Sequence, residues 1–317
     1  MHIDVKVDLN IIAENIKSYG GKGVLLMVKS DGYGHGITAV AKHVESLVYG
    51  FGVATVEEGA LLRKVGVKAP IMVCQWLPHE IGRAKLCKLV LSVGTFDGLE
   101  IAKASGIPVA LKINTGMNRF GFDTEDLPLL KEKIGGVNVK WVYSHIYSTD
   151  SATEQYYLFE RCKKALSVDC DNHILASSTA RLFDGDIVRV GIGAYKGAMT
   201  VESVVVAVKR LGVGDNVGYG KTMAESGYIA WVFGGYNDGI DRENPQPILI
   251  DGKPRQVIAV CMDCIAVFTD DHKATVGEKA IFIGKDLTTD MVAQMTETIP
   301  YTILTRWKGR IKRTYIK

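Results

Sequence analysis

The sequence lacks any long hydrophobic run. Its apolar stretches are short, such as VLLMV at 24–28, whereas a helix that spans a bilayer needs about 20 consecutive apolar residues. The first ten residues, MHIDVKVDLN, carry charges every few positions and contain no apolar segment typical of a secretory signal. We therefore expect no membrane span and no secretion, and we expect the protein to be cytoplasmic.

An excess of charge of one sign is also absent. The 317 residues include 38 Lys+Arg and 35 Asp+Glu, which leaves a formal net charge of +3. This balance argues against a dedicated nucleic-acid-binding protein and against a strongly acidic, disordered chain. A hydrophobic fraction of 47% is ordinary for a globular protein, and the length predicts about two domains.

Cysteines are few and do not form a disulfide framework. Six are scattered along the chain: Cys74, Cys87, Cys162, Cys170, Cys261 and Cys264. Cys261 and Cys264 form a single CxxC motif, but a zinc site would need a second matching pair. A thioredoxin-like motif should open a helix, whereas Cys261 follows the apolar run 257–260. Ordinary thiols are the favoured interpretation, and a metal or redox role is the alternative.

The first two-thirds of the chain alternates between short apolar runs and helix-like stretches. Eight runs are predicted to be buried strands: 24–28, 48–54, 71–74, 89–93, 108–113, 139–144, 173–176 and 187–190. Apolar residues three and four positions apart predict helices between them, for example at 37–47, 57–65, 97–105 and 157–167. Eight strands with interleaved helices predict an α/β fold with a (β/α)₈ TIM-like barrel. An open, doubly wound sheet is the alternative.

The pattern changes after about residue 200. The runs 201–211, 228–236, 247–252, 255–268 and 279–284 are β-rich and are joined by turns rich in Gly and Asp. Helical periodicity returns only at 290–299. We predict a barrel over residues 8–200 and a C-terminal β-domain over residues 201–317, which the N-terminal strand 1–7 joins.

One segment carries candidate chemistry. The run 24–28 is followed by Lys29 and then by SDGYGHG at 30–36. A lysine directly after a buried parallel strand lies at the carboxyl mouth of a barrel, where active sites of this architecture are found. Its amine can form a Schiff base with a carbonyl group. Taken alone, Lys29 is better explained as a solvated lysine before a polar turn.

The segment VKSDGYGHG (28–36) strongly resembles the lysine motif that binds pyridoxal 5′-phosphate (PLP) in the alanine racemase family. Further blocks resemble the same family in the same order: LKINTGMNRFGF (111–122), YSHIYSTD (143–150), ASSTA with VRVGIGAY (176–180, 188–195), VGYGKT with GGYNDG (217–222, 234–239) and VCMD (260–263). The resemblance covers essentially the whole chain. It implies a PLP-dependent amino-acid racemase with a barrel and a C-terminal β-domain. It also implies a homodimer in which each β-domain completes the partner's active site.

The resemblance assigns two catalytic bases. Lys29 matches the lysine that holds PLP and then acts on one face of the substrate Cα, and Tyr219 matches the opposing base, supplied by the other subunit. Racemisation needs a proton removed from one face and another delivered to the opposite face, and two bases accomplish this directly.

The resemblance also implies the residues that bind cofactor and substrate. Arg189 matches the arginine that faces the pyridine nitrogen of PLP, and His145 matches the residue that supports it. The phosphate-binding set implied by the family is Tyr33, Ser178, Gly191 and Ile192. By the same comparison, Arg119 contacts both the phenolic oxygen of PLP and the substrate carboxylate, and Tyr236 and Met262 lie near that carboxylate. No metal is implied.

Two departures from the family pattern stand out. The family usually has K-x-D-T-G where this chain has Lys112 and Asn114, and that lysine is often carbamylated. A tyrosine commonly precedes the R-V-P-R stretch near the end, and Gly309 stands at that position. Losing an aromatic ring would enlarge the pocket, so we expect substrates larger than alanine, such as serine or lysine.

Two other functions compete with racemisation. A PLP-dependent decarboxylase of the same barrel class would carry a carboxylate against the pyridine nitrogen, where this chain has Arg189. A non-catalytic PLP carrier would keep Lys29 but would consist of the barrel alone, and the presence of residues 201–317 with Tyr219 argues against it.

Overall fold

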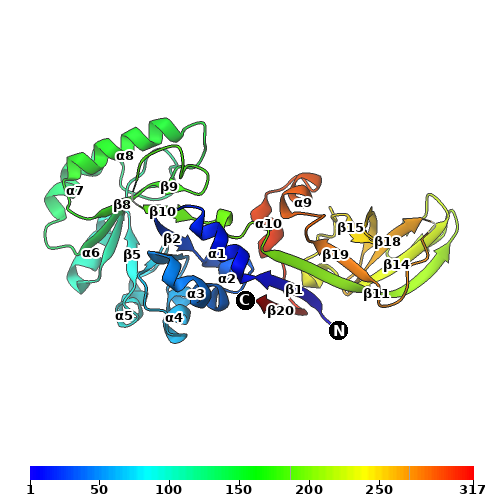
Figure 1. The fold of residues 1–317 in the computed structure, drawn as a ribbon. Helices are drawn as coiled ribbons and strands as arrows, with labels where there is room; N and C mark the ends of the chain where they lie inside the picture. The colour runs from blue at the N-terminus through cyan, green and yellow to red at the C-terminus, as the bar shows by residue number, and fades with distance from the viewer. Residues whose placement is uncertain (186, 271) are drawn as a thin grey trace. The chain divides into compact units, whose positions relative to one another are not determined.

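The computed structural model describes residues 1–185, 187–270 and 272–317 (Figure 1). The chain divides into two compact units. The first contains residues 12–32 and 37–194, drawn from blue to green, and the second contains residues 1–11, 33–36 and 195–317. The first unit is an α/β barrel and the second is built mainly from antiparallel strands.

The barrel sheet is parallel throughout. Its order is β8-β7-β6-β5-β4-β3-β2-β10-β9. The strands are β2 (Gly23–Met27), β3 (Gly50–Val53), β4 (Ile71–Val73), β5 (Val90–Val93), β6 (Val109–Lys112), β7 (Val139–Tyr143), β8 (Asp171–His173), β9 (Leu175–Ala176) and β10 (Ile187–Val190). Parallel strands covered on both faces are nearly continuous apolar runs, which explains why the sequence predicted them well.

The eighth predicted strand is broken, and the break closes the barrel. Within 171–176, the piece β8 pairs with β7, and the piece β9 pairs with β10. Since β10 also pairs with β2, the segment 171–176 joins the two edges of the sheet. The predicted (β/α)₈ barrel is confirmed. Leu25, Met72 and Trp141 pack in its interior and are fully buried.

Helices cover most of the crossovers. They are α1 (Leu9–Lys17), α3 (Ile37–Val44), α4 (Val56–Lys64), α5 (Ile81–Leu86), α6 (Phe96–Ser105), α7 (Leu127–Lys133) and α8 (Ala152–Leu166). Thr55 and Thr95 cap α4 and α6 by accepting a hydrogen bond from the N–H of the third following residue, as N-cap residues do. Between β9 and β10, the described residues 177–185 form turns instead of a helix.

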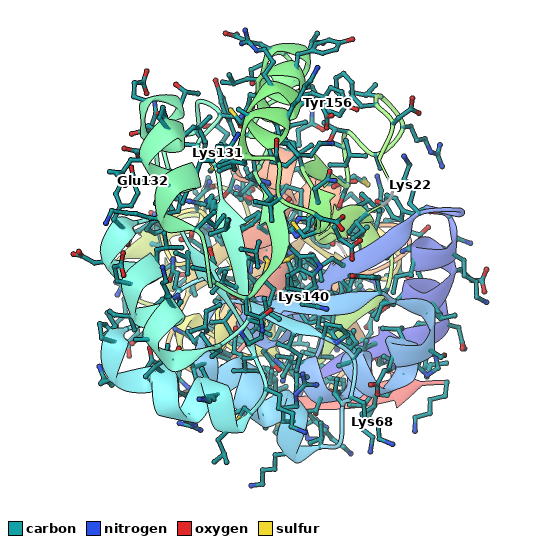
Figure 2. The ribbon with its side chains drawn as sticks, turned by 90° about the vertical axis from the view of Figure 1, so that its left-hand side faces the viewer. Lys22, Lys68, Lys131, Glu132, Lys140 and Tyr156 are labelled. Carbon is teal, nitrogen blue, oxygen red and sulfur yellow. The ribbon has the colours of Figure 1, made fainter. Side chains whose placement is uncertain are left out.

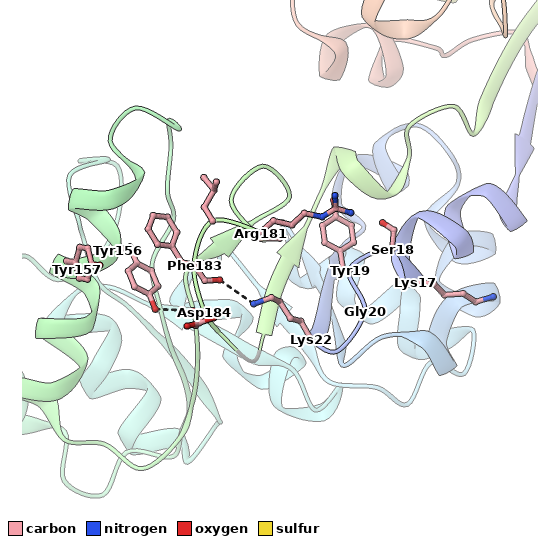
Figure 3. A pocket seen from close by; sticks show the side chains of 12 residues that line it. Lys17, Ser18, Tyr19, Gly20, Lys22, Tyr156, Tyr157, Arg181, Phe183 and Asp184 are labelled. Carbon is pink, nitrogen blue, oxygen red and sulfur yellow. Dashed lines mark hydrogen bonds between the residues drawn. The ribbon is translucent and has the colours of Figure 1, made fainter.

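That helix-free crossover leaves a cavity of about 770 Å³ (Figure 3). Residues 180–184 lie between the end of α1 and the helix α8. Lys22 donates to the carbonyls of Phe183 and Gly185, and Tyr156 donates to the carbonyl of Asp184. These hydrogen bonds fix the short loop 180–185, which takes the position that a packed helix would otherwise occupy.

The two ends of the barrel differ in chemistry. Lys22 and Lys68 precede β2 and β4, so the face in Figure 2 is the amino end of the strands. At the opposite, carboxyl end, Lys112 ends β6, Lys29 follows β2, and Arg189 is the last residue but one of β10. Active sites of barrels of this kind lie at the carboxyl end.

The second unit is a β-domain. Its strands are β1 (Ile3–Asp8), β11 (Met199–Leu211), β12 (Asn216–Val217), β13 (Lys221–Thr222), β14 (Gly227–Phe233), β15 (Ile248–Ile250), β16 (Lys253–Arg255), β17 (Val257–Val260), β18 (Cys264–Asp270), β19 (Lys279–Ile283) and β20 (Ile311–Ile316). Two short helices follow β19: α9 (Thr289–Met295) and α10 (Pro300–Thr305). The N-terminal strand β1 pairs with β11 and β20.

Two predicted elements of this unit are divided in the structure. The apolar run 255–268 contains two strands, β17 and β18, which are separated by the turn at residues 261–263. The predicted helix 290–299 ends early, and Pro300 begins the separate helix α10. None of the helices in the described part of the chain combines the length and apolar character that a membrane crossing requires.

Candidate active site

Lys29 begins an unusual turn at the carboxyl end of β2. The segment α2 (Lys29–Tyr33) contains Ser30, Asp31 and Gly32 with φ of 54°, 54° and 62°, which is the left-handed region. Such backbone costs about 1–3 kcal/mol per non-glycine residue and persists only where neighbours fix it. The Ser30 N–H donates to Glu58 Oε1 (2.8 Å), and Asp31 Oδ1 accepts from the N–H of Ile37 (2.9 Å). The Glu58 side chain of α4 and the backbone N–H of Ile37 in α3 therefore hold the turn that carries Lys29.

Four cationic side chains converge on the mouth of the barrel. Lys29, Arg189, Lys112 and Arg119 all act electrostatically on the thiol of Cys74, at the end of β4. Each cation favours the thiolate, but burial is the larger influence, and the pKa of Cys74 is raised. The sequence analysis did not single out Cys74, although its position after a predicted strand was a usable signal.

Lys112 is a buried cation among other cations. It is 6% exposed, and its ammonium group lies 5.3 Å from the ring centre of Phe120 and 5.9 Å from that of Tyr143. Burial, followed by the charges of Arg119 and Arg189, lowers the pKa of Lys112 to about 8. No carboxylate is among the main charges that act on this amine. The site therefore carries an excess of positive charge that favours an anion.

Arg189 is fixed by uncharged acceptors. Its guanidinium donates to His173 Nδ1 (2.9 Å), to His145 Nδ1 (2.8 Å) and to the carbonyl of Ser144 (2.8 Å). It also lies over the ring of Tyr143, 5.4 Å from its centre. Because a guanidinium only donates hydrogen bonds, both Nδ1 atoms must be unprotonated. The predicted pairing of His145 with Arg189 is present, and His173 is a second support that the sequence analysis missed.

Both histidines are held neutral. Burial, followed by the charge of Arg189, lowers the pKa of His145 to about 3. Burial and Arg189 also lower the pKa of His173 well below its ordinary value. Neutral imidazoles that accept at Nδ1 carry their proton at Nε2. The two imidazoles and the Ser144 carbonyl that accept from Arg189 are thus all uncharged.

A buried amide supports this arrangement. Gln155 of α8 is 2% exposed and donates both to the carbonyl of His145 (3.1 Å) and to Thr115 Oγ1 (3.1 Å). Thr115 in turn shares a hydrogen bond of 2.7 Å with the hydroxyl of Ser144. Since the Ser144 carbonyl binds Arg189, this network fixes the end of β7 that positions the arginine.

The turn after β10 brings part of the predicted phosphate-binding set together. The Gly191 N–H donates to Ser177 Oγ (3.1 Å), and Ile192 begins a single helical turn, Ile192–Ala194. The predicted Ser178 is exposed, so Ser177 is the serine that reaches this turn. A Cβ at Gly193 would lie 2.2 Å from the Tyr19 hydroxyl, so only glycine lets the backbone pass here.

Tyr33, the remaining residue predicted to bind phosphate, belongs to the second unit. It is 5% exposed and stacks on Tyr195, with ring centres 4.9 Å apart. Tyr301 of α10 lies 5.8 Å from it, centre to centre. The aromatic packing fixes the Tyr33 ring within its own unit.

Tyr219 occupies the tip of a two-stranded hairpin. It lies between β12 and β13, flanked by Gly218 (φ 59°) and Gly220 (φ 77°). Its side chain is 81% exposed. The two glycines supply the left-handed backbone that this tight turn requires, and the turn projects the tyrosine away from the hairpin.

The loops that carry Tyr236 and Met262 are clamped together. The Tyr236 N–H donates to the carbonyl of Cys261 (3.1 Å). The Arg310 guanidinium forms ion pairs with two carboxylates: Nη2 lies 2.6 Å from Asp238 Oδ2, and Nη1 lies 2.7 Å from Asp263 Oδ1. Burial of Asp238 opposes its ionisation, but the bonds from Arg310 prevail and lower the pKa of Asp238. The predicted substrate residues of this unit therefore share one supported surface.

Gly309 has a structural reason to be glycine. Its φ is +69°, and a Cβ there would lie 2.9 Å from the carbonyl oxygen of Asn237 and 2.9 Å from Asp238 Oδ1. This close approach of the backbone at Gly309 brings the guanidinium of the next residue, Arg310, into contact with the Asp238 carboxylate. A tyrosine at position 309 would be strained and would collide with this loop, so substituting one is not a clean test of pocket size.

Comparisons with known proteins agree with this site. The family model of the alanine racemase N-terminal domain matches residues 7–199, and that of the C-terminal domain matches residues 198–315. An alanine racemase of Streptococcus agalactiae is 30% identical over 98% of this chain and 97% of its own length.

Solved structures share the fold. Alanine racemase from a Streptomyces lavendulae that produces D-cycloserine superposes with a TM-score of 0.91 at 27% identity, covering all of this chain and 97% of the other. Alanine racemase from Bartonella henselae, solved with covalently bound pyridoxal phosphate, has a TM-score of 0.92 at 23% identity, with both chains fully covered. This chain belongs to the alanine racemase family of PLP-dependent amino-acid racemases.

The residues at the barrel mouth fit this cofactor. PLP carries a phosphate, and the mouth holds the buried cations Lys112 and Arg189. Arg189 presents a donor that cannot lose its proton, which suits a ring nitrogen that accepts a hydrogen bond. In the described residues, no group of three His, Cys, Asp or Glu side chains is placed to share a metal ion.

Proposed function

We propose that the protein interconverts the L- and D-forms of alanine and of larger amino acids by a two-base mechanism with PLP. The observation that carries this proposal is the set of buried cations around Arg189, whose guanidinium is held by two neutral histidines. When bound, PLP supplies an electron sink that stabilises the negative charge left at Cα after proton removal. The remaining chemistry belongs to side chains of the protein.

Lys29 and Tyr219 are the proposed proton carriers. The Lys29 amine, at the carboxyl mouth of the barrel, attaches the cofactor and then exchanges a proton with one face of the substrate Cα. The Tyr219 hydroxyl exchanges a proton with the other face. Its exposure of 81% is consistent with a residue that acts outside its own unit.

Arg189, His145 and the turn after β10 are proposed to orient the cofactor. Arg189 donates to the ring nitrogen, and His145 holds the guanidinium in place. The backbone N–H groups of Gly191 and Ile192, with Ser178 and Tyr33, bind the phosphate, and Ser177 is a further candidate because it already binds the Gly191 N–H. An arginine at the ring nitrogen leaves that nitrogen unprotonated, which limits side reactions that a protonated ring promotes.

Arg119, Tyr236 and Met262 are proposed to hold the substrate carboxylate, with Met262 acting through its backbone N–H. The clamp made by Arg310 keeps the last two on one surface. Because Tyr219, Tyr236 and Met262 belong to the β-domain, we propose a homodimer in which residues 201–317 of one subunit complete the barrel site of the other. D-amino-acid supply, as for a bacterial cell wall, is the proposed purpose.

The proposed substrate range includes serine and lysine besides alanine. Gly309 stands where the family has a tyrosine, so the pocket lacks that ring. A pocket discriminates by only about 1–3 kcal/mol per methylene, so the preference should be graded. Substrate range is best measured directly, since a Gly309→Tyr variant would disturb the loop at Asn237 and Asp238.

Exchange of the α-proton tests the proposed function. PLP-loaded protein is incubated in heavy water with L-alanine, L-serine or L-lysine in separate tubes. Proton NMR follows loss of each α-proton signal, and chiral chromatography follows each D-enantiomer. Exchange together with D-product supports two-base racemisation, and the fastest substrate defines the specificity.

Two other outcomes would change the proposal. Exchange without D-product would mean that Lys29 works and that Tyr219 does not. No exchange with any amino acid, despite bound PLP, would overturn racemisation and favour a PLP carrier.

A further inference from the structure

The CxxC motif lies at the centre of the second unit's candidate surface. Cys261 and Cys264 face each other at the end of the β17–β18 hairpin, directly after the pair Val260 and Ile265. The Cys261 N–H donates to the carbonyl of Cys264 (2.9 Å), and the Cys261 thiol helps to raise the pKa of the Cys264 thiol. Side chains directly opposite each other in an antiparallel ladder lie on the same face. The motif is therefore a matched pair of thiols.

Cys261 contacts each of the three segments proposed to act on the substrate. Its carbonyl accepts the N–H of Tyr236 (3.1 Å). Its Sγ lies 3.6 Å from the position that a Cβ would take on Gly218, so it packs beneath the turn that carries Tyr219. Met262 follows it directly in the chain. A movement of Cys261 is therefore transmitted to all three segments.

We propose that Cys261 and Cys264 form a reversible disulfide that inactivates the racemase by displacing the segments of Tyr219, Tyr236 and Met262. The inference rests on the proposed function, because those three residues must act on the substrate for the displacement to matter.

The chemistry needs only a peroxide as oxidant. Hydrogen peroxide oxidises the Cys261 thiol to a sulfenic acid and releases one water. The Cys264 sulfur then attacks the Cys261 sulfur, an S–S bond forms, and the sulfenic oxygen leaves with the Cys264 proton as a second water. Two thiols are oxidised by two electrons and one peroxide is reduced. A thiol reductant such as dithiothreitol reverses the change by exchange.

The order of the two thiols follows from their surroundings. Burial, then the neighbouring Cys261 and Asp263, raise the pKa of Cys264 to about 11. Cys264 therefore stays protonated at neutral pH and reacts slowly with peroxide. Oxidation of Cys261 removes the contribution of that thiol to the raised pKa, which favours attack by Cys264 in the second step. Both cysteines are only half-buried, and Met262 between them is 52% exposed, so a small peroxide can reach them.

Disulfide closure should distort the turn. Cβ atoms directly opposite in an antiparallel pair are about 4.5–5.5 Å apart, whereas a disulfide brings them to about 3.5–4.5 Å. The hairpin must therefore contract by about 1 Å, and a misplacement of about 1 Å can reduce catalysis about a hundredfold. Strained disulfides are also the more easily reduced ones, which makes the change reversible.

The test compares three proteins loaded with PLP: wild type, Cys264→Ser and the control Cys87→Ser, in which a half-buried cysteine of the barrel is replaced. Each is treated with hydrogen peroxide, digested and mapped by mass spectrometry, and its racemisation rate is measured before oxidation, after oxidation and after dithiothreitol. We expect wild type and Cys87→Ser to gain the 261–264 disulfide, to lose about a hundredfold in rate and to recover with dithiothreitol. Cys264→Ser should keep its rate.

Three results would overturn the proposal: no 261–264 disulfide in the oxidised wild type, a disulfide that leaves the rate unchanged, or equal inactivation of Cys264→Ser. The last would point to another thiol, such as Cys74 in the barrel. Failure of the proposed function is recognised separately, because reduced wild type would then racemise no amino acid although the peptide map could still contain the disulfide.

Discussion

The two units place their candidate residues in opposite surroundings. In the barrel, Lys112 and Arg189 are only 6% and 7% exposed. In the second unit, Tyr219 is 81% exposed and Met262 is 52% exposed. Burying a charged group costs free energy unless it is paired and hydrogen-bonded, whereas an exposed aromatic or thioether side chain gains free energy when another surface covers it. The barrel therefore resembles a finished receptor for an anion, and the second unit resembles a surface that completes a site elsewhere.

The supports of the two regions also differ. Arg189 is held by neutral acceptors, namely His145, His173 and a carbonyl. Arg310 is held by the carboxylates of Asp238 and Asp263. An arginine held by neutral groups keeps its charge available to a ligand, while one paired with two carboxylates acts as a structural clamp. The same side chain thus serves recognition in one unit and architecture in the other.

The largest expected effect separates the two bases. Lys29→Ala should abolish α-proton exchange with both enantiomers, because the cofactor loses its attachment and one face of Cα loses its base. Tyr219→Phe should reduce racemisation by about 10²–10⁴-fold but should leave exchange with one enantiomer. Exchange is measured by NMR in heavy water with L- and D-alanine in separate tubes.

The matched control for this pair is Tyr147→Phe, which removes another exposed hydroxyl (54% exposed). It should leave both exchange and racemisation near the wild-type rate. If Tyr219→Phe racemises as fast as this control, the exposed surface of the second unit has no part in the chemistry, and the contrast between the two regions must be explained otherwise.

The clamp that Arg310 forms with Asp238 and Asp263 should increase the free energy of unfolding. Arg310→Ala leaves the fully buried Asp238 carboxylate without its guanidinium, and breaking a buried pair in this way costs about 3–5 kcal/mol. Urea denaturation should detect the loss, and the double variant Arg310→Ala/Asp238→Asn should recover part of it, since the buried charge of Asp238 is then removed and only the exposed Asp263 loses its partner. No recovery in the double variant would contradict a charge-based clamp.

The Asp238 carboxylate should also make the stability of the protein depend on pH. The pKa of Asp238 is lower in the folded protein than in the unfolded chain, so its contribution to stability is present above about pH 4. That contribution is lost as the pH falls through the folded value. Asp238→Asn should therefore flatten the loss of stability in acid.

Lys112 should give a dependence of the same sign, but in the alkaline range. Its pKa is lowered from 10.5 to about 8, so between these values the unfolded chain binds more protons and stability rises with pH. The full effect is at most about 3 kcal/mol. Lys112→Met should remove this rise in cofactor-free protein and should increase stability at pH 7. Denaturation midpoints between pH 7 and pH 10.5 measure it, and an unchanged slope would show that the amine is not titrating in the folded state.

The fold was predictable because its signals are local. Buried parallel strands are apolar runs, and eight of them predicted the barrel. What the sequence could not indicate was that residues 171–176 are shared between two pairings, because strand breaks depend on barrel closure. In the sequence, the lack of a helix before β10 was indicated only by the small number of residues between the last two predicted strands.

The candidate site was predictable where motifs are contiguous. Lys29, Arg189 and His145 follow strands, and the structure brings Arg189 and His145 into contact. The sequence analysis missed His173, Cys74 and Gln155. Their importance comes from packing against elements that are distant in the sequence; Gln155 and Arg189, for example, are 34 positions apart. Ser177 was also missed: it accepts the Gly191 N–H while the neighbouring Ser178 is exposed, because adjacent residues of a turn direct their side chains differently.

The smallest expected effect concerns Gly309. Gly309→Ala adds a methyl group 2.9 Å from the Asn237 carbonyl at a φ of +69°, whereas Gly252→Ala adds one in open space at a φ of +65°. The left-handed backbone costs alanine about 1–2 kcal/mol in both, so any further loss in Gly309→Ala measures the collision alone. Thermal denaturation of both variants gives this difference. Equal losses would mean that the Asn237 loop yields freely, and the absence of a side chain at 309 would then have to be explained by the room that it leaves for substrate.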